Sequence, residues 1–407
     1  MKSDLYYNLS KRVDLTTYVT WVLFLYGMSL LTVHLAYNAV PVLLALPGLV
    51  LLVRKKLDFP PDLKRLFFIF LIFLTPIILS IVLGFSSLSY LDRPVRSLYY
   101  LLAAALIIKA RPRFDLYLIG LALGQWALLI LLLGQKLNKV DRPAIWSNPI
   151  LVSEVAVGVF ALLIAAWGWP RGWKKTIALL GQACCLPIIL ITETRGTFLA
   201  LLGVLFFTFL FMVAWQMLRR RVAVILVAVL VIGSALVISQ TSLGGRFYEM
   251  MTNTHNYQTG EKFSSAGIRL ELWKESWLLG AERPLTGYGN LGRMPRVREL
   301  IFQGKLDSFV VGWGHSHSDY FEALATRGIP GLLSVLVLYL CPLVIFFRHR
   351  LSSPYLSLSG IALVIGYLIS SLTDVPLRNG LTSMFLFMAI TVTVAFLDIE
   401  AQSSNPE

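Results

Sequence analysis

Charged residues are scarce in this chain. Asp, Glu, Lys and Arg together make up 14% of its 407 residues, whereas hydrophobic residues make up 57%. Soluble domains contain roughly 25% charged residues. This composition excludes an ordinary soluble domain and indicates a protein built mainly from helices in a membrane.

Cysteine is scarce as well, and acidic metal-binding motifs are missing. The three cysteines, Cys184, Cys185 and Cys341, all lie in apolar stretches. This placement excludes a disulfide framework or a cysteine zinc site in the polar parts of the chain. The polar parts also contain no Asp-x-Asp motif of the kind that holds a metal ion.

Acidic residues are fewer than basic ones: 22 Asp and Glu against 36 Lys and Arg, which gives a net charge of +14. Cations next to membrane helices, facing anionic lipid, account for most of such an excess. We therefore expect membrane lipids as partners and no nucleic acid.

Apolar stretches of about 20 residues, the length that spans a bilayer, recur along the chain. They predict an all-α polytopic membrane protein with about twelve transmembrane helices, near residues 17–37, 39–53, 66–83, 92–108, 114–133, 150–169, 174–192, 197–217, 221–239, 330–347, 353–371 and 380–398.

Lys and Arg are distributed unequally among the short loops between these stretches. With the N-terminus inside, clusters such as Arg54-Lys55-Lys56 and Arg219-Arg220-Arg221 fall on the cytoplasmic side. Cytoplasmic loops carry such an excess, so we expect both termini in the cytoplasm. The longest polar stretch is then external, and the chain divides into transmembrane helices at 1–239, an external helical loop at 240–329, and transmembrane helices with a cytoplasmic tail at 330–407.

The clearest motif ends this loop, where Gly314-His315-Ser316-His317-Ser318 precedes Asp319. Asp319 and Glu322 are typical of a capping box, which predicts a helix that starts just after His317. Gly328-Ile329-Pro330-Gly331 should break that helix before the tenth span.

This arrangement would fix His317 at a helix N-terminus, with Tyr320 on the same helix face. The positive end of a helix and nearby arginines disfavour an imidazolium. The imidazole would then be neutral, as a general base must be. His315, two residues earlier, competes for the same role.

Two arginines interrupt apolar sequence. Arg195 follows the seventh span, where it could bind a diphosphate through bidentate hydrogen bonds or pair with Glu193. Arg269, Trp273 and Trp277 repeat at helical spacing and share one face. Arg269 breaks that apolar stripe, so we expect a binding role for it, although the tryptophans could also pack against the spans.

Other polar residues stand at the predicted outer ends of spans. Arg93 and Arg96, one turn apart, could hold a phosphate at a helix N-terminus or anchor the helix at the interface. Glu154 lies just inside the sixth span, and an ionisable group there is a functional candidate. Asp374 and Arg378 frame the last outer turn as a capping pair, with a substrate role left open.

Two further stretches of the loop read as structural. Pro284–Asn290 is a Gly-rich turn without the lysine and the strand–helix context of a phosphate-binding loop. The cations Arg293, Arg296, Arg298 and Lys305 are typical of a solvated face near the membrane, and substrate contact is the alternative.

Thr194–Leu201 at a span end, Arg269 with Trp273 in a long loop, and His317-Ser318 followed by Gly328–Gly331 resemble the O-antigen ligases (lipid A-core:surface polymer ligases). This family belongs to a wider group with O-antigen polymerases and bacterial protein O-oligosaccharyltransferases. The resemblance covers the whole chain in topology. It implies a GT-C-like glycosyltransferase with one large periplasmic helical loop.

The resemblance also implies an activity. Such enzymes move O-antigen from undecaprenyl diphosphate, the donor, to the lipid A-core oligosaccharide, the acceptor, at the periplasmic face of the bacterial inner membrane. No cofactor and no metal are implied. His317, Arg195 and Arg269 would be catalytic, and the residues implied to bind substrate are Arg93, Arg96, His315, Trp273 and Tyr320.

Three alternatives stay open at this point. An O-antigen polymerase would join two lipid-linked glycans, and a single dominant loop late in the chain favours a ligase over it. A protein O-oligosaccharyltransferase more often carries a further soluble C-terminal region. A transporter or flippase places ionisable groups near the bilayer midplane, whereas here they crowd the predicted outer surface.

Overall fold

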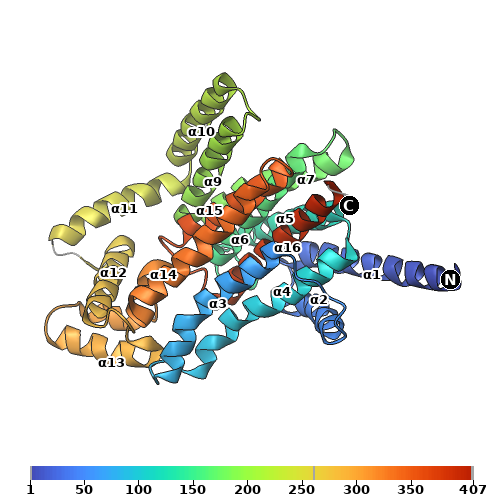
Figure 1. The fold of residues 1–407 in the computed structure, drawn as a ribbon. Helices are drawn as coiled ribbons and strands as arrows, with labels where there is room; N and C mark the ends of the chain where they lie inside the picture. Colours follow the sequence, from blue (N-terminus) through green and yellow to red (C-terminus); the bar gives the residue numbers. More distant parts are fainter. Residues whose placement is uncertain (1, 260–261, 405–407) are drawn as a thin grey trace.

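The computed structural model describes residues 2–259 and 262–404, and all regular structure in these two ranges is helical (Figure 1). The α-helices are α1 (Lys2–Ser29), α2 (Ala36–Val53), α3 (Pro61–Val82), α4 (Asp92–Ala110), α5 (Phe114–Leu137), α6 (Pro149–Leu163), α7 (Trp173–Ala183), α8 (Cys185–Thr192), α9 (Arg195–Ala214), α10 (Arg220–Gln240), α11 (Ser242–Thr259), α12 (Ser265–Glu282), α13 (Gly289–Phe302), α14 (Asp319–Arg348), α15 (Pro354–Ser370) and α16 (Gly380–Ser404). The short 3-10 helices are η1 (Leu88–Leu91), η2 (Ile164–Gly168) and η3 (Ser308–Gly312).

Each predicted span overlaps a helix or two consecutive helical segments. Nine segments in the described ranges are long and apolar enough to cross a membrane; α6 with η2 and α7 with α8 each count as one. The helix α15 is apolar but shorter. The helices α1 and α4 contain more polar and charged residues. The chain is thus an all-α, multi-pass membrane protein, and the figure of twelve crossings stays a prediction.

The first predicted span, 17–37, is wrong in its boundaries. The helix α1 starts at Lys2 and ends at Ser29, and a turn precedes α2. Leu35, the residue before α2, has a φ of 70°. A left-handed residue ends regular helix, so the apolar run continues in sequence while the backbone turns.

The helices differ greatly in how much protein covers them. In the membrane-length window of α16, 94% of the residues are buried, whereas the figure for α10 is 6%. An apolar helix with almost no protein cover is stable only in an apolar solvent, so the exposed faces of α10 are suited to lipid. The core is built around α16, α6 and α15, and α10 lies at the periphery next to α9 (Figure 1).

The helices α12 and α13 gather at the end of the bundle opposite the two ends of the chain (Figure 1). A small apolar core of their own joins them to the first turns of α14; its buried members are Leu272, Leu279, Val297, Leu300, Leu306, Val310 and Ala325. The polar segment therefore folds onto the bundle through α14 and is not a free loop.

The helix α14 is broken at Gly328, as the sequence predicts. Its backbone there has φ 67° and ψ −159°, a conformation that is essentially limited to glycine. The Gly-rich turn at 284–288 holds the break, because the Ile329 amide donates to the Pro284 carbonyl at 2.7 Å and the Tyr288 amide to the Ala325 carbonyl at 3.0 Å. The turn thus makes structural contacts with α14, and the break falls at Gly328, within the predicted Gly328–Gly331 element.

Candidate functional site

Arg195 and Arg269 converge on one residue, Ser265, at the first position of α12. The Arg195 Nη2 donates to the Ser265 hydroxyl at 2.9 Å. The Arg269 Nη1 donates to the same hydroxyl at 3.3 Å and to the Ser265 carbonyl at 3.0 Å. The structure thus brings together two predicted arginines, one from an apolar span and one from the polar segment.

Local structure fixes the Arg195 side. Thr194, just before α9, is buried, and its hydroxyl lies 2.9 Å from that of Ser153 on α6. Glu193 ends α8 in a left-handed conformation with a φ of 55°. A tight α8–α9 turn held by buried hydroxyls leaves the Arg195 side chain directed away from the core, toward α12.

A cavity of about 470 Å³ surrounds this pair of arginines. Its walls come from α6, the α8–α9 turn, α11, α12 and residues 373–374, and it is lined by Arg142, Ile150, Glu154, Glu193, Thr194, Arg195, Gly196, Thr197, Leu199, Phe247, Glu249, Ser265, Ala266, Arg269, Leu270, Trp273, Thr373 and Asp374. The lining thus combines apolar side chains with three arginines and four carboxylates, so it offers a ligand both apolar and charged contacts.

Three polar atoms of residues at this cavity are buried without a hydrogen-bond partner among the described residues, the Arg269 Nε, the Glu154 Oε2 and the Trp273 Nε1. Burial lowers the pKa of Arg269, and the nearby Asp374 opposes that shift. A buried donor without a partner is costly, so the Arg269 Nε is a candidate donor to an anion, in a cavity that the carboxylates of Glu154, Glu193, Glu249 and Asp374 also line. Trp273 also lines it and stacks on Phe321 with ring centres 5.3 Å apart.

His317 lies close to this cavity, next to Asp374, which is part of the cavity wall. Its Nδ1 is 3.9 Å from the Asp374 Oδ1, too far for a hydrogen bond, and has no hydrogen-bond partner in the described residues. Asp374 lines the cavity, whereas His317 is not among the described residues that do. The arrangement places an imidazole next to the two arginines without putting all three on one wall.

The two histidines differ in which ring nitrogen is available. The His317 backbone N–H donates to the His315 Nδ1 at 3.3 Å, and the rings are 4.2 Å apart at 78°. A neutral His315 whose Nδ1 accepts carries its proton on Nε2, so it has no free lone pair for a base. Burial lowers the pKa of His315 to about 4, with His317 and Arg378 adding to the shift. This geometry favours His317 as the base.

The predicted capping box at Asp319 and Glu322 is wrong. The residue before the helix is Ser318, and it makes no side-chain cap. The Asp319 carboxylate accepts from Tyr339, from Ser371 and from the Leu377 amide. Both carboxylates are buried, so they serve tertiary contacts, which are stronger in the interior than an exposed cap would be.

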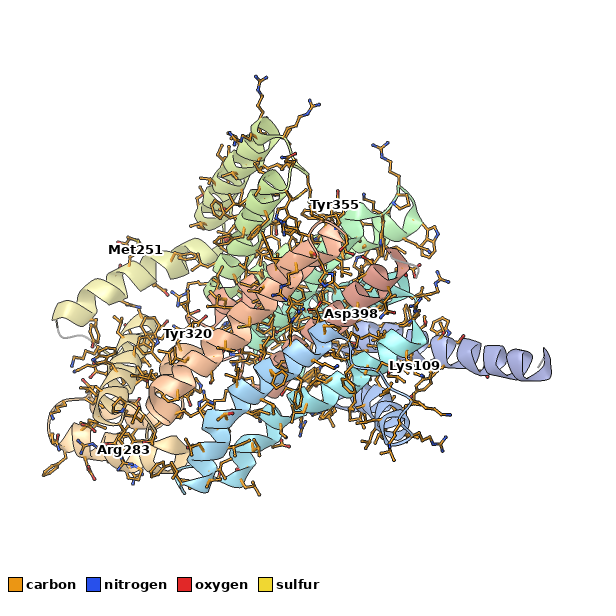
Figure 2. The ribbon with its side chains drawn as sticks, viewed as in Figure 1. Lys109, Met251, Arg283, Tyr320, Tyr355 and Asp398 are labelled. Atoms are coloured by element: carbon orange, nitrogen blue, oxygen red, sulfur yellow. The ribbon has the colours of Figure 1, made fainter. Side chains whose placement is uncertain are left out.

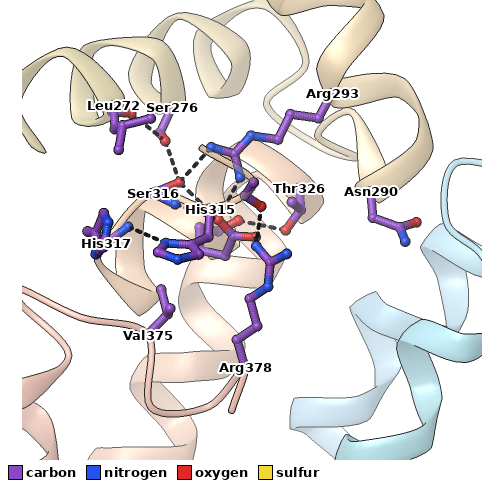
Figure 3. Close-up of polar contacts among 12 residues, drawn as sticks. Leu272, Ser276, Asn290, Arg293, His315, Ser316, His317, Thr326, Val375 and Arg378 are labelled. Carbon is purple, nitrogen blue, oxygen red and sulfur yellow. Dashed lines mark hydrogen bonds and ion pairs between the residues drawn. The ribbon is translucent and has the colours of Figure 1, made fainter. Parts of the chain in front are cut away.

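Glu322 belongs to a buried ion network centred on Arg293 (Figure 3). The Arg293 guanidinium lies 2.7 Å from Glu275 and 2.7 Å from Glu322, and it donates to the Ser316 hydroxyl at 3.1 Å. Burial opposes the charge on Arg293, but the two carboxylates outweigh it and raise its pKa. Ser276 donates to Ser316 at 2.7 Å from the other side.

This network corrects the prediction that Arg293 lies on a solvated face, because its side chain is only 3% exposed. Arg296 makes ion pairs with Glu282 and Glu299 at the surface, and Arg298 is exposed. Ser316 lies between the two histidines in sequence, so Arg293 fixes the histidine segment in place. Sequence spacing alone does not reveal this, because the partners come from α12, α14 and the segment before α14.

A second cavity, of about 740 Å³, lies where α3, η1 and α4 face α13 and the start of α14. Arg93 lines it and donates to the Arg378 carbonyl. Arg327 and Arg378 line it as well. Arg327 was not a predicted site residue, whereas for Arg378 a substrate role was left open; the sequence signal for both is a charged residue beside a glycine or proline turn at a span end.

The remaining predicted residues lie away from both cavities. Arg96 pairs with Asp92 at 2.9 Å and donates to Asn38 at 2.6 Å, an arrangement that anchors α4. The Tyr320 hydroxyl donates to the Leu368 carbonyl at 2.9 Å. Figure 2 shows Tyr320 within the helices of the bundle, at a distance from Arg283 at the loop end. The described residues contain no group of three or more His, Cys, Asp or Glu side chains placed to hold a metal ion.

Comparison with known proteins finds a family match for part of the chain. Residues 180–336 match the model of the family described as O-antigen ligase, and this range contains Arg195, Arg269 and both histidines. Over 398 residues the chain is 21% identical to an uncharacterized protein of Haemophilus influenzae, an alignment that covers 92% of this chain and 97% of the relative. Over residues 180–336 the chain is therefore similar to the O-antigen ligase family.

Proposed function

We propose that this chain is an inverting glycosyltransferase that ligates O-antigen glycan from undecaprenyl diphosphate onto lipid A-core oligosaccharide. The reaction would take place at the periplasmic face of the bacterial inner membrane, with both termini in the cytoplasm. The observation that carries the proposal is the convergence of Arg195 and Arg269 on Ser265 in a partly apolar cavity, within the range that is similar to the O-antigen ligase family.

The donor's diphosphate would take the place of the Ser265 hydroxyl as the acceptor for these arginines. Guanidinium groups bind phosphate oxygens with paired, charge-assisted hydrogen bonds. When the bond between the anomeric carbon and the diphosphate oxygen breaks, its electron pair leaves with the diphosphate. The arginines would stabilise that growing charge, and preorganised charge of this kind is often the largest single catalytic contribution.

His317 would act as the general base. The acceptor hydroxyl attacks the anomeric carbon from the face opposite the leaving diphosphate, its proton passes to the imidazole, and the configuration inverts. The free Nδ1 of His317 faces Asp374, whose carboxylate 3.9 Å away would favour a proton on that nitrogen. The Nε2 lone pair would then remain for the acceptor, which meets the requirement for a base within reach of the hydroxyl.

The orientation rests on the uneven distribution of Lys and Arg among the loops. The end of the bundle that holds α12 and α13 also holds the arginine cavity and lies opposite both ends of the chain. An external loop and cytoplasmic termini are consistent with that arrangement.

The test is transfer by purified protein in lipid, with an undecaprenyl-diphosphate glycan as donor. Rough lipopolysaccharide and a second lipid-linked glycan are offered together as acceptors, in the presence of a chelator. We expect the glycan to appear on lipopolysaccharide. If only a longer lipid-linked polymer forms, the ligase proposal is wrong and the polymerase takes its place; if neither product forms, the chain is not a glycosyltransferase for this donor.

A further inference from the structure

Arg327 is a buried arginine without a polar partner. It is only 8% exposed, lines the 740 Å³ cavity, and its Nε is buried with no hydrogen-bond partner among the described residues. Its guanidinium carbon lies 6.0 Å from the centre of the Tyr90 ring. A buried charge usually has a carboxylate partner, and Arg327 has none in the described structure.

The three carboxylates at this cavity are already engaged. Glu322 pairs with Arg293 and lies 3.3 Å from Arg378. Asp92 pairs with Arg96. Asp319 accepts three hydrogen bonds, from Tyr339, Ser371 and the Leu377 amide. Among the arginines in the described cavity wall, Arg93 and Arg327 therefore have no carboxylate partner. Their positive charge makes the cavity suited to an anion.

The backbone around Arg327 is built to hold it there. Gly331 faces its stem, since a Cβ on Gly331 would lie 2.4 Å from the Arg327 Cβ and 3.1 Å from its Nε. Gly287 approaches from the other side, where a Cβ would lie 2.4 Å from the Arg327 amide nitrogen. Gly331 thus leaves space for the Arg327 side chain, and Gly287 allows the close approach of the backbone at 326–327.

The two cavities flank the histidine segment. In the loop before α16, Thr373 and Asp374 line the smaller cavity, whereas Leu377 and Arg378 line the larger one. Figure 3 shows His317 on one side of Arg378 and Asn290, which lines the larger cavity, on the other. A ligand in the larger cavity would therefore approach His317 from the side opposite the Arg195–Arg269 pair.

We propose that the larger cavity binds the acceptor through a phosphoryl group, held by Arg327 with Arg93. The assignment of this ligand as the acceptor rests on the proposed function; the presence of an anion site does not. An acceptor anchored by a phosphoryl group in one cavity and a donor held by its diphosphate in the other would meet at His317.

Binding is measured first, without turnover. Detergent-solubilised full-length protein is titrated with rough lipopolysaccharide, either phosphorylated or chemically dephosphorylated. We expect the phosphorylated form to bind the wild type about 10- to 100-fold more tightly, the range that charge-assisted hydrogen bonds to one group supply. Arg327→Gln should lose that preference, and Arg298→Gln, an exposed charge on α13 outside the cavity, should keep it.

Folding of the variants is controlled in two ways. Thermal melting is compared for each variant, and Arg93→Gln serves as a second test because Arg93 is exposed and its loss does not threaten the core. A reduced preference for the phosphorylated acceptor in Arg93→Gln supports the proposal independently of Arg327→Gln. An unchanged preference in both variants overturns it.

Two competitors identify the source of the anion. If phosphatidylglycerol in nanodiscs displaces the phosphorylated acceptor equally well, the cavity holds a bilayer headgroup and the acceptor assignment is wrong. If inorganic phosphate binds through Arg327 but the phosphorylated acceptor does not, the cavity takes an adventitious ion only, which also overturns the proposal.

Transfer kinetics separate this proposal from the proposed function. Arg327→Gln should raise the acceptor KM at least tenfold and leave the donor KM unchanged. If the wild type transfers no glycan yet still binds the phosphorylated acceptor through Arg327, the proposed function fails while the anion site stands. If transfer proceeds and the acceptor KM of Arg327→Gln equals that of the wild type, the site is wrong and the proposed function stands.

Discussion

Arg195 and Arg269 donate to the same hydroxyl, that of Ser265, at 2.9 and 3.3 Å. One arginine starts a membrane-length helix and the other lies one turn into α12. Because both donate to one hydroxyl, they lie at one site, and Arg269 also donates to the Ser265 carbonyl.

The first prediction follows from that shared acceptor. Arg195→Gln and Arg269→Gln should each lower kcat/KM for glycan transfer by about 10²–10³, as the loss of one preorganised donor does elsewhere. The double variant should lose much less than the product of the two effects, because both act on one group. Arg298→Gln is the control for removal of a positive charge. If the fold-reduction of kcat/KM in the double variant equals the product of the two single reductions, the two arginines act independently.

The second prediction concerns the base. His317→Asn should slow transfer by about 10²–10⁴, while His315→Asn should have a smaller effect. Asparagine is chosen because His317 has a φ of 48°, and Asn tolerates the left-handed conformation better than Ala. Single-turnover transfer with saturating donor is the measurement. A larger loss in His315→Asn would transfer the role to His315.

The third prediction separates a buried ion network from a surface one on the same helix. Arg293→Met leaves Glu275 and Glu322 without their cation in the interior, which should cost about 3–5 kcal/mol. Arg296→Met removes ion pairs at the surface and should cost at most about 1 kcal/mol. Thermal melting in detergent compares the two. Equal shifts would mean that the Arg293 network contributes no more than a surface pair.

The fourth prediction tests the break in α14. Gly328→Ala would place a Cβ 2.3 Å from the Pro284 carbonyl oxygen, whereas at Gly304, with a similar φ of 70°, a Cβ meets nothing within 4 Å. Both variants carry the strain of a positive φ, about 1–2 kcal/mol, and Gly328→Ala adds a backbone collision. We expect Gly328→Ala to lower the melting temperature clearly more than Gly304→Ala. Equal shifts in melting temperature would show that the collision with Pro284 does not affect stability.

The fifth prediction is a pH effect on stability. His315 has a pKa of about 4 in the folded protein, lowered mainly by burial, against about 6.5 in the unfolded chain. The unfolded state then binds more protons between these values, so stability is complete above about pH 6.5 and falls as pH drops toward 4. Partial exposure reduces the effect to about 1–2 kcal/mol.

The measurement for His315 is the melting temperature of wild type and His315→Gln at pH 7 and pH 5. Other carboxylates titrate in both proteins, so the difference between their pH slopes isolates His315. We expect the variant to lose less stability on acidification. Parallel slopes would show that the pKa of His315 does not change on folding.

The sequence correctly predicted those features of the structure that a short stretch of residues determines. Long apolar runs predict the helices, because a bilayer admits few other backbones. Gly328 predicts the break in α14, since only glycine adopts that backbone. The motifs at Arg195, Arg269 and His317 also predict the family of residues 180–336.

Burial and pairing of charged groups were decided in space. Arg293 belongs to a run of cations that resembles a solvated face, yet its partners on α12 and α14 draw it into the interior. Asp319 and Glu322 have the spacing of a cap, but buried partners on other elements outcompete it. The sequence around Arg327 does not predict the cavity that this residue lines.

The sequence by itself determined an all-helical membrane protein and the residue types of its site, because hydrophobic run length and glycine geometry act locally. Only the tertiary structure decided that Arg195 and Arg269 meet at Ser265, that His317 lies next to Asp374, and that Arg327 faces a second cavity. The physical reason is that a buried charge is stabilised by the partner that the packing of distant helices brings within hydrogen-bond distance. A local sequence pattern does not predict which residue that partner is.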